Sequence, residues 1–322
     1  MMAAALNSMH RVLVLGGSGF VGRALCERLA QSHPGLRLLV PTRRNAHGQA
    51  VRPLPNVDLV TADVHDAAAL ARLAAGCDAV VNLVAILHGN EAAFERVHVA
   101  LPRSIVAACR TAGVTRLVHV SALGVAADAP SRYLRSKAAG EAVFTGSGLA
   151  VTVLRPSVIF GAQDRFLNVF GQLQQLAPFM PLAFGSARFQ PVWVQDVAAA
   201  LVAVLDDPAT AGRTFECAGP REITLSELVR LSGRWAGAER PQIPLPAWAG
   251  SLQAAAMELM PGEPLMSRDN VASMSVPNVA TGTRPGLAGL GITPTPLEAV
   301  APGYLADRFG PMAQDRFRAR RR

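Results

Sequence analysis

The sequence is poor in charged side chains, aromatic rings and long hydrophobic runs, and each shortage excludes a class of protein. Only 17% of the 322 residues are charged and half are hydrophobic, which excludes an intrinsically disordered chain. Aromatic residues make up 5%, and no recognition motif accompanies the basic residues, so we expect no nucleic-acid partner. No apolar run reaches the roughly 18 residues of a membrane span, and the amino terminus lacks the features of a secretory signal.

Cysteine is scarce as well, and its spacing excludes a disulfide framework. Cys26, Cys77, Cys109 and Cys217 stand far apart, without a Cys-x-x-Cys pair. The seven histidines are scattered through the first 119 residues without the spacing of metal ligands. We therefore expect reduced core thiols, no metal site and a cytoplasmic protein.

A glycine-rich stretch near the amino terminus organises the rest of the chain. The apolar run 12–15 is typical of a strand buried on both faces, and Gly16, Gly19 and Gly22 follow it at three-residue spacing. Val21, Leu25 and Leu29 then mark one face of a helix. Strand, glycine turn and helix in this order predict a dinucleotide-binding βα unit, in which the glycines permit a tight turn and close approach of a pyrophosphate.

Strand and helix patterns alternate after this unit and predict an α/β fold. We expect a Rossmann-type doubly wound parallel sheet with a small, mostly helical C-terminal substrate lobe. The fourth strand is predicted over residues 79–87, and a long helix over 94–113 that is kinked at Pro102. The predicted parts are an NAD(P)-binding Rossmann domain at 10–240, containing an irregular lid segment at 179–190, a cap at 241–308 and a basic, disordered tail at 309–322.

The end of the second strand indicates which nucleotide the chain prefers. An NAD site would place an acidic side chain here to bind the ribose 2′-hydroxyl, whereas this chain has Arg43 and Arg44, which suit a 2′-phosphate. An uninvolved surface pair is the alternative. We therefore predict NADP, with NAD less favoured. The predicted cofactor-binding residues are Gly16, Gly17, Ser18, Gly19, Phe20, Val21, Gly22, Arg43, Arg44, Asp63, Val64, Val84, Ala85, Lys137 and Pro156.

Three polar residues after the fifth strand form a candidate catalytic group. Ser121 lies at a predicted strand carboxyl end, and Tyr133 and Lys137 lie one helical turn apart, with Ser131 as a plausible N-cap. An ammonium beside a phenol favours the phenolate, so we expect a lowered tyrosine pKa and proton exchange with a substrate hydroxyl or carbonyl. Ser121 would bind the same oxygen.

Composition strengthens this interpretation. Lys137 is the only lysine among 31 basic residues, and Tyr133 is one of two tyrosines. Random placement would put a tyrosine four residues before the lone lysine roughly once in 160 trials. A surface Tyr–Lys pair is therefore a weaker explanation than a catalytic pair.

The motifs together resemble the short-chain dehydrogenase/reductase superfamily. Three further segments, 119–124, 154–166 and 188–198, are similar to its atypical branch, typified by the NAD(P)-binding accessory subunit of respiratory complex I (alpha-subcomplex subunit 9) and bacterial relatives. The resemblance spans about residues 11–305. It implies a bound NADPH that stays in place without demonstrated turnover, and a branch that often lacks the full catalytic set. This chain departs from that branch because it keeps Ser, Tyr and Lys.

Two functions stay open from the sequence. The first is an NADP(H)-dependent oxidoreductase or epimerase that acts on a hydroxyl or carbonyl of an apolar, quinone- or isoprenoid-like small molecule. The second is a non-catalytic NADP(H)-binding scaffold of a respiratory complex or of quinone metabolism. The arginines of the last seven residues predict either a solvated tail or weak contact with the inner face of a membrane. The apolar segment 247–260 is predicted to be a packed helix, with a membrane- or partner-facing helix as the alternative.

Overall fold

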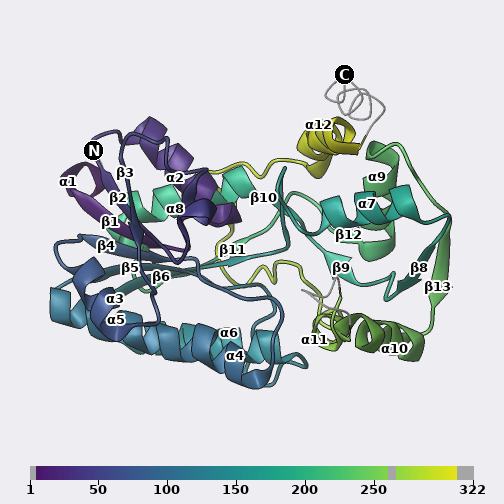
Figure 1. Cartoon of the computed structure of the whole chain (residues 1–322), viewed down its shortest axis with the longest axis horizontal. Coiled ribbons are helices and arrows are strands. Elements are labelled where there is room, and N and C mark those ends of the chain that lie inside the picture. Colours follow the sequence, from purple (N-terminus) through teal and green to yellow (C-terminus); the bar gives the residue numbers. More distant parts are fainter. Residues whose placement is uncertain (1–4, 260–265, 310–322) are drawn as a thin grey trace.

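The computed structural model describes residues 5–259 and 266–309, and its centre is a seven-stranded sheet in which every neighbouring pair is parallel (Figure 1). The strand order is β11-β6-β5-β4-β1-β2-β3, so the order reverses between β1 and β4. This reversal is where open α/β sheets bind ligands. The strands are β1 (Arg11–Leu15), β2 (Arg37–Thr42), β3 (Val57–Thr61), β4 (Ala79–Asn82), β5 (Arg116–Val120), β6 (Ala150–Pro156) and β11 (Thr214–Cys217).

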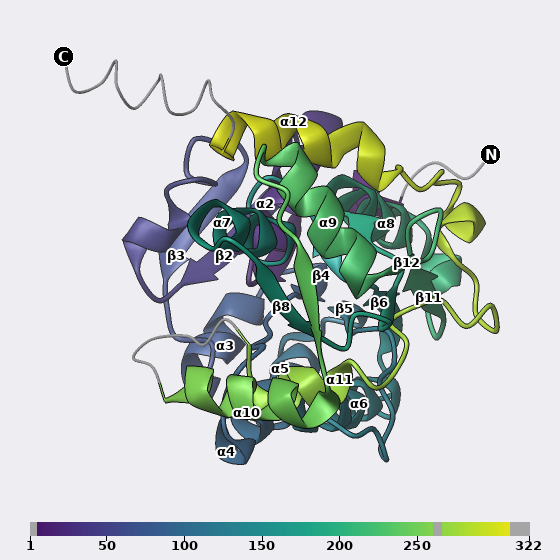
Figure 2. The ribbon, with the colours of Figure 1, turned by 90° about the vertical axis from the view of Figure 1, so that its right-hand side faces the viewer.

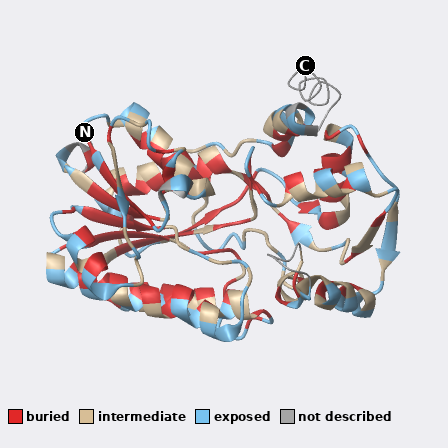
Figure 3. Cartoon of the chain, viewed as in Figure 1, coloured by how far each residue is buried: buried red, intermediate tan, exposed pale blue. Residues whose placement is uncertain are grey.

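Helices cover both faces of this sheet, as the prediction of a doubly wound sheet requires. The two faces have separate hydrophobic cores, and the strands between them are largely buried except for the edge strand β3 (Figure 3). The short helix α1 (Ala5–Ser8) packs against α8. One face carries α2 (Phe20–Ser32) and α8 (Val194–Asp206), and the other carries α3 (Ala67–Ala74), α5 (Leu101–Ala112) and α6 (Arg132–Thr145).

Two predicted elements are shorter or less regular than expected. The strand predicted at 79–87 ends at Asn82, because the Asn82 side chain accepts a hydrogen bond from the backbone N–H of Val84 and the chain turns over the glycine loop. The helix predicted at 94–113 consists of α4 (Glu91–Glu95), a π-helical segment (Arg96–Ala100) and α5. A π-helical segment thus lies just before Pro102, where the sequence predicts a kink, and it fits a proline that has no N–H to give to the preceding turn.

A second lobe is built from the chain beyond β6, apart from α8 and β11, and it has its own hydrophobic core (Figure 2). It contains three two-stranded sheets, in which β7 pairs with β10, β8 with β13 and β9 with β12. Its strands are β7 (Ile159–Phe160), β8 (Met180–Ala183), β9 (Arg188–Phe189), β10 (Val192–Trp193), β12 (Ile223–Thr224) and β13 (Gln242–Leu245). Its helices are α7 (Leu167–Leu176), α9 (Leu225–Trp235), α10 (Ala247–Glu258), α11 (Arg268–Ser273) and α12 (Leu297–Phe309).

This second lobe corrects one expectation about the chain and leaves others as predictions. The segment 179–190 is not irregular, since it forms β8 and β9, whose strand partners β13 and β12 lie later in the chain. The lobe also includes α7 and α9, which precede the predicted boundary at residue 240. The boundary itself and a lid role for 179–190 stay predictions. The predicted tail from residue 310 onward lies outside the described residues.

The four cysteines are buried free thiols, as expected from their spacing. Within residues 5–259 and 266–309, no helix is both long enough and apolar enough to cross a membrane. In the same part of the chain, no three His, Cys, Asp or Glu side chains gather in a way that could hold a metal ion.

Candidate active site

The glycine turn between β1 and α2 is sterically adapted to a close-packed loop. Gly16 has a φ of +82°, and a Cβ there would lie 3.1 Å from the Leu83 carbonyl carbon and 3.2 Å from the Val84 nitrogen. A Cβ on Gly22 would lie 2.3 Å from the Gly16 oxygen. Helix α2 begins after Gly19 without a side-chain cap, so its first N–H groups are free of such a partner. An uncapped helix start behind a glycine turn suits a phosphate group.

The other predicted cofactor residues lie along the same edge of the sheet. Gly17 packs against Val40 near the end of β2. Arg43 and Arg44 follow β2 and are exposed. Burial lowers the pKa of His65, and the positive charge of Arg43 contributes to this shift. Arg43 therefore lies near the turn that starts at Asp63.

Some predicted contacts differ in character from the rest. Val64 and Val84 are half-buried and Ala85 is exposed, whereas Pro156 is buried and its carbonyl accepts a hydrogen bond from Leu123 N. Ser18 and Val21 are half-buried beside the glycines. Phe20 points away from the turn, because its ring packs close to Gly161 and lines a pocket described below. A cofactor contact of Phe20 would therefore involve its backbone.

Ser121 and Lys137 meet at the carboxyl end of β5. Lys137 is buried, and its Nζ donates a hydrogen bond of 2.7 Å to the carbonyl of Val120, the residue before Ser121. The Ser121 hydroxyl is also buried, and it has no hydrogen-bond partner within the described part of the chain. A buried hydroxyl without a partner costs free energy, so this atom is suited to bind the oxygen of a ligand.

Tyr133 lies on α6 one turn before Lys137, and its ring has an aromatic surround. Its centroid lies 6.3 Å from that of Phe94 and 5.6 Å from that of His98, both in edge-on geometry. It also packs against the cluster that contains Ala122. The predicted N-cap is confirmed, since the Ser131 hydroxyl accepts a hydrogen bond from Leu134 N. The fold therefore brings Ser121, Tyr133 and Lys137 to one end of β5.

The tyrosine pKa differs from the expectation. Burial raises the pKa of Tyr133 to about 12, whereas the sequence pattern predicted a lowered value. The expectation was wrong because it considered the ammonium charge and omitted desolvation, which disfavours the phenolate. Tyr133 is therefore protonated at neutral pH and can act as an acid.

Lys137 responds to the same burial in the opposite direction. Burial lowers the pKa of its ammonium to about 8, and the nearby Glu141 carboxylate opposes this shift. Glu141 is itself paired with Arg155, whose Nε and Nη2 donate hydrogen bonds of 3.0 and 2.6 Å to its two oxygens. The ion pair fixes Glu141 one turn beyond Lys137 on α6.

We expect the only lysine to lose its proton near pH 8. Protein labelled at the lysine ε-carbon gives one lysine resonance, so its NMR titration reports Lys137 directly. A midpoint near the ordinary value of 10.5 would contradict the burial of the amine, and Glu141→Gln should lower the midpoint further. The unfolded chain keeps this proton up to about pH 10.5, so Lys137 by itself makes stability rise with pH from about 8 upward. Above about pH 9 the four buried cysteine thiols act in the opposite direction, because burial raises their pKa above the value of 9.0 in the unfolded chain. The rise in stability is therefore expected between about pH 8 and 9.

Sequence reasoning missed a polar contact that supports Tyr133. His98 Nε2 accepts a hydrogen bond from Ile86 N, and His98 Nδ1 lies 2.8 Å from the Ser136 hydroxyl. Ser136 in turn donates to the Tyr133 carbonyl. Burial, together with the Lys137 charge, lowers the pKa of His98 to about 3, so the imidazole is neutral. Only its place one turn after Phe94 on the predicted helix could have indicated His98.

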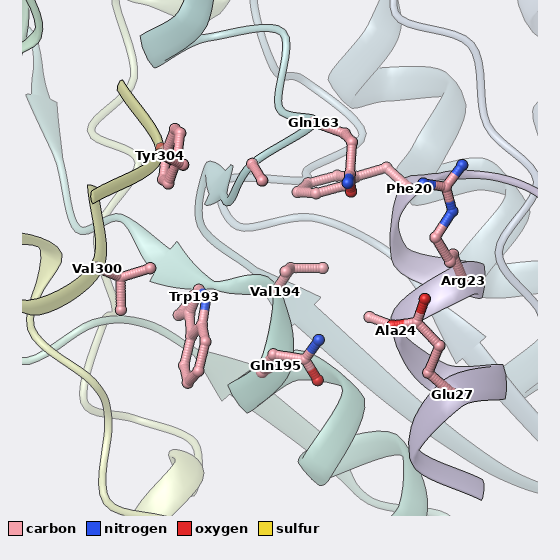
Figure 4. A pocket seen from close by; sticks show the side chains of 11 residues that line it. Phe20, Arg23, Ala24, Glu27, Gln163, Trp193, Val194, Gln195, Val300 and Tyr304 are labelled. Atoms are coloured by element: carbon pink, nitrogen blue, oxygen red, sulfur yellow. The ribbon is translucent and has the colours of Figure 1, made fainter. Parts of the chain in front are cut away.

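A separate cavity of about 320 Å³ lies between the two lobes (Figure 4). Its wall includes Phe20 and Arg23 from α2, Trp193 from β10 and Tyr304 from α12. The hydroxyl of Tyr304 donates a 2.8 Å hydrogen bond to Asp164. None of Ser121, Tyr133 and Lys137 lines this cavity, so it is distinct from the candidate catalytic group.

A parallel sheet with a glycine turn beside its switch point defines a Rossmann-type α/β protein. Residues 12–218 match the NAD dependent epimerase/dehydratase family, and the chain belongs to that family. Its resemblance to the short-chain dehydrogenase/reductases and to the complex I subunit is thereby confirmed.

The proteins that this chain resembles are named as a respiratory-complex subunit and as reductases. The chain is 33% identical over 302 residues to NADH dehydrogenase (ubiquinone) 1 alpha subcomplex subunit 9, mitochondrial, of Mus musculus, covering 88% of this chain and 77% of the relative. It is 31% identical to a ceramide reductase of Caulobacter vibrioides, with 75% of each chain covered. An NADPH-dependent quinone oxidoreductase from Escherichia coli, complexed with NADPH, has a similar fold, with a TM-score of 0.73, 20% identity and coverage of 92% and 99%.

Proposed function

We propose that the protein is an NADP(H)-dependent oxidoreductase or epimerase that acts on a hydroxyl or carbonyl group of an apolar small molecule. The observation that carries this proposal is the buried Ser121 hydroxyl, which lacks a partner in the described chain and lies next to the carbonyl held by Lys137. A purely structural site would not need to leave such an atom unsatisfied. The names of two relatives, a ceramide reductase and a ketoreductase, fit this class of reaction.

The cofactor residues fit a dinucleotide. The glycine turn and the uncapped start of α2 would hold the pyrophosphate, Arg43 and Arg44 the 2′-phosphate, and Lys137 the nicotinamide ribose. NADPH supplies a hydride when it is bound.

In the reducing direction, the residues of the chain supply the proton. Ser121 donates a hydrogen bond to the carbonyl oxygen and orients it. Tyr133 is protonated at neutral pH and transfers its phenolic proton to that oxygen as the carbon gains the hydride, which yields an alcohol. The buried Lys137 ammonium then stabilises the phenolate until solvent returns the proton.

An apolar substrate is favoured by the surroundings of Tyr133. Phe94, Ala122 and Val276 pack around or beside its ring, and Leu87 is an exposed apolar residue in the loop after β4. Phe94 and Ala122 are already buried, so a substrate with an apolar body would gain by covering the exposed Leu87 and the half-buried Val276, in proportion to the area covered.

The cofactor preference tests the first half of this proposal. We expect calorimetric titration to show tighter binding of NADPH than of NADH. Arg43→Ala should weaken NADPH binding by about 1–3 kcal/mol, the scale of a lost charged hydrogen bond, and leave NADH binding nearly unchanged. Arg72→Ala, on the exposed end of α3, is the matched control and should change neither. Equal affinities for the two nucleotides in the unmodified protein would contradict the assignment.

A second candidate function is that of a non-catalytic NADP(H)-binding subunit in a membrane-associated respiratory assembly. The second lobe carries most of the large hydrophobic residues that are exposed in the described chain: Leu176, Phe179, Ile243, Trp248, Leu252 and Leu259. They come from α7, the segment before β8, strand β13, and α10 with the residue that follows it, and α7, β8 and α10 face the viewer in Figure 2. Exposed apolar side chains on one lobe can serve as an interaction surface. For this candidate we place the protein in the cytoplasm, at the inner face of the membrane.

Sedimentation with anionic vesicles tests this second candidate. The terminal arginines should give binding that weakens as salt rises, because exposed charges are screened beyond about 8 Å at physiological ionic strength. Deleting residues 312–322 should remove the salt-sensitive part, and Trp248→Ser with Leu252→Ser should remove the remainder. Val60→Ser, on the other lobe, is the control. Absence of binding at low salt would exclude the membrane contact.

A further inference from the structure

The helix that carries Tyr133 is capped by a residue from the second lobe. The carboxylate of Asp269, in the first turn of α11, accepts hydrogen bonds of 2.7 Å from Arg132 N and 2.9 Å from Tyr133 N. Ser131 accepts the next N–H of α6, that of Leu134. Of the first three N–H groups of α6, two therefore donate to Asp269, which lies 137 residues after Arg132, and one donates to the adjacent Ser131.

This contact is made by a buried side chain and is not a contact between two surface side chains. The Asp269 side chain is only 8% exposed, and a buried carboxylate is costly unless its charge is compensated. Its compensation comes from the positive end of α6 and from Arg132, whose Nε lies 3.5 Å from one oxygen. α11 is itself held in shape by a capping box between Ser267 and Asn270.

The chain that follows α11 reaches the other side of the site. Val276 packs in one cluster with Tyr133, Leu134 and Ala122. A Cβ on Gly124 would lie 3.3 Å from Cγ1 of Val276. A single stretch of the second lobe thus contacts both the helix of Tyr133 and the turn that follows Ser121.

We infer that Asp269 is a positioning residue through which the second lobe holds Tyr133 in its reactive place. The inference rests on the proposed function, since it assigns Tyr133 the role of proton donor. Asp269 contacts the backbone of the helix start and the Arg132 side chain, so it acts through Tyr133 and not on the substrate. The acid of the reaction is therefore in place only while α11 is docked on α6.

Because the chain has only two tyrosines, the position of Tyr133 can be tested by NMR without a substrate. Ring-fluorinated tyrosine gives two fluorine resonances, and Tyr304→Phe assigns them. Asp269→Asn keeps the size of the side chain but turns an N–H group toward one of the two backbone donors. We expect it to broaden or move the Tyr133 resonance, leave that of Tyr304 unchanged, and lower the pKa of the Tyr133 analogue by about one unit.

The sign of that shift follows from the cause of the raised pKa, which is burial of the phenol. His98 from the π-helical segment packs edge-on against the ring, Lys137 lies one turn along the same helix, and Asp269 and Arg132 lie at the helix start. Releasing the helix start exposes the phenol, and loss of burial favours the phenolate. Ser131→Ala, which weakens the same helix start without touching the other lobe, is the control and should leave the Tyr133 resonance in place.

Turnover provides the second arm of the test. Asp269→Asn should lower kcat about tenfold or more without changing NADPH affinity, and it should have no further effect in a Tyr133→Phe background. Lower thermal stability with an unchanged Tyr133 resonance and unchanged kcat would overturn the inference. If Tyr133→Phe itself kept full activity, the proposed function would fail, whereas the fluorine measurement would still report whether Asp269 holds Tyr133.

Discussion

Tyr133→Phe is expected to lower kcat by about 10²–10⁴-fold, the usual contribution of a positioned acid or base, and to leave NADPH affinity nearly unchanged. The substitution removes only the phenolic O–H, while the ring contacts with Phe94 and His98 are kept. The measurement is steady-state kinetics with NADPH and a panel of apolar ketones and quinones, together with calorimetric titration of the nucleotide.

The chain offers a matched control for this substitution. Tyr304→Phe makes the same chemical change at the other tyrosine, whose hydroxyl binds Asp164 between the lobes and away from Ser121 and Lys137. It should lower stability somewhat and keep kcat. Retained turnover in Tyr133→Phe would show that another group supplies the proton, and equal losses in both variants would point to a structural effect.

Gly22→Ala is expected to disable nucleotide binding. Its Cβ would lie 2.3 Å from the Gly16 oxygen and 2.5 Å from the Gly17 Cα, and these are backbone atoms that cannot rotate away. The turn must therefore shift, at a cost of about 1–3 kcal/mol in stability. Because the shift displaces the N–H groups that would bind the pyrophosphate, the protein should bind NADPH about 10–150-fold more weakly, which corresponds to the loss of one charged hydrogen bond.

Gly35→Ala is the control for this experiment. A Cβ on Gly35 meets no atom within 4 Å, so both thermal stability and NADPH affinity should stay as in the unmodified protein. Thermal denaturation separates the loss of stability from the loss of NADPH binding. Without ligand, the change in melting temperature reports the strain, and the further rise when NADPH is added reports the binding free energy. Full NADPH affinity in Gly22→Ala would contradict the assignment of this turn to the pyrophosphate.

Local patterns in the sequence were enough to predict most of the Rossmann core. The segments 12–15, 36–40, 57–61 and 114–121, rich in Val and Leu, predict β1, β2, β3 and β5 to within two residues at each end, because the strands of a parallel sheet covered by helices need hydrophobic stretches. The second lobe was predicted less well. Its strands β8 and β9 are short and pair with segments later in the chain, so no local periodicity identifies them.

For the candidate site, the sequence by itself determined which groups are present and in what local spacing: the glycine turn at 16–22, the four-residue interval from Tyr133 to Lys137, and the Ser131 cap. Tertiary structure decided their environment. Burial, which no spacing encodes, raises the tyrosine pKa and lowers that of the lysine. The Asp269 cap comes from another lobe, and hydrogen bonds between residues far apart in sequence leave no periodic trace, so only the folded chain reveals what holds Tyr133 in place.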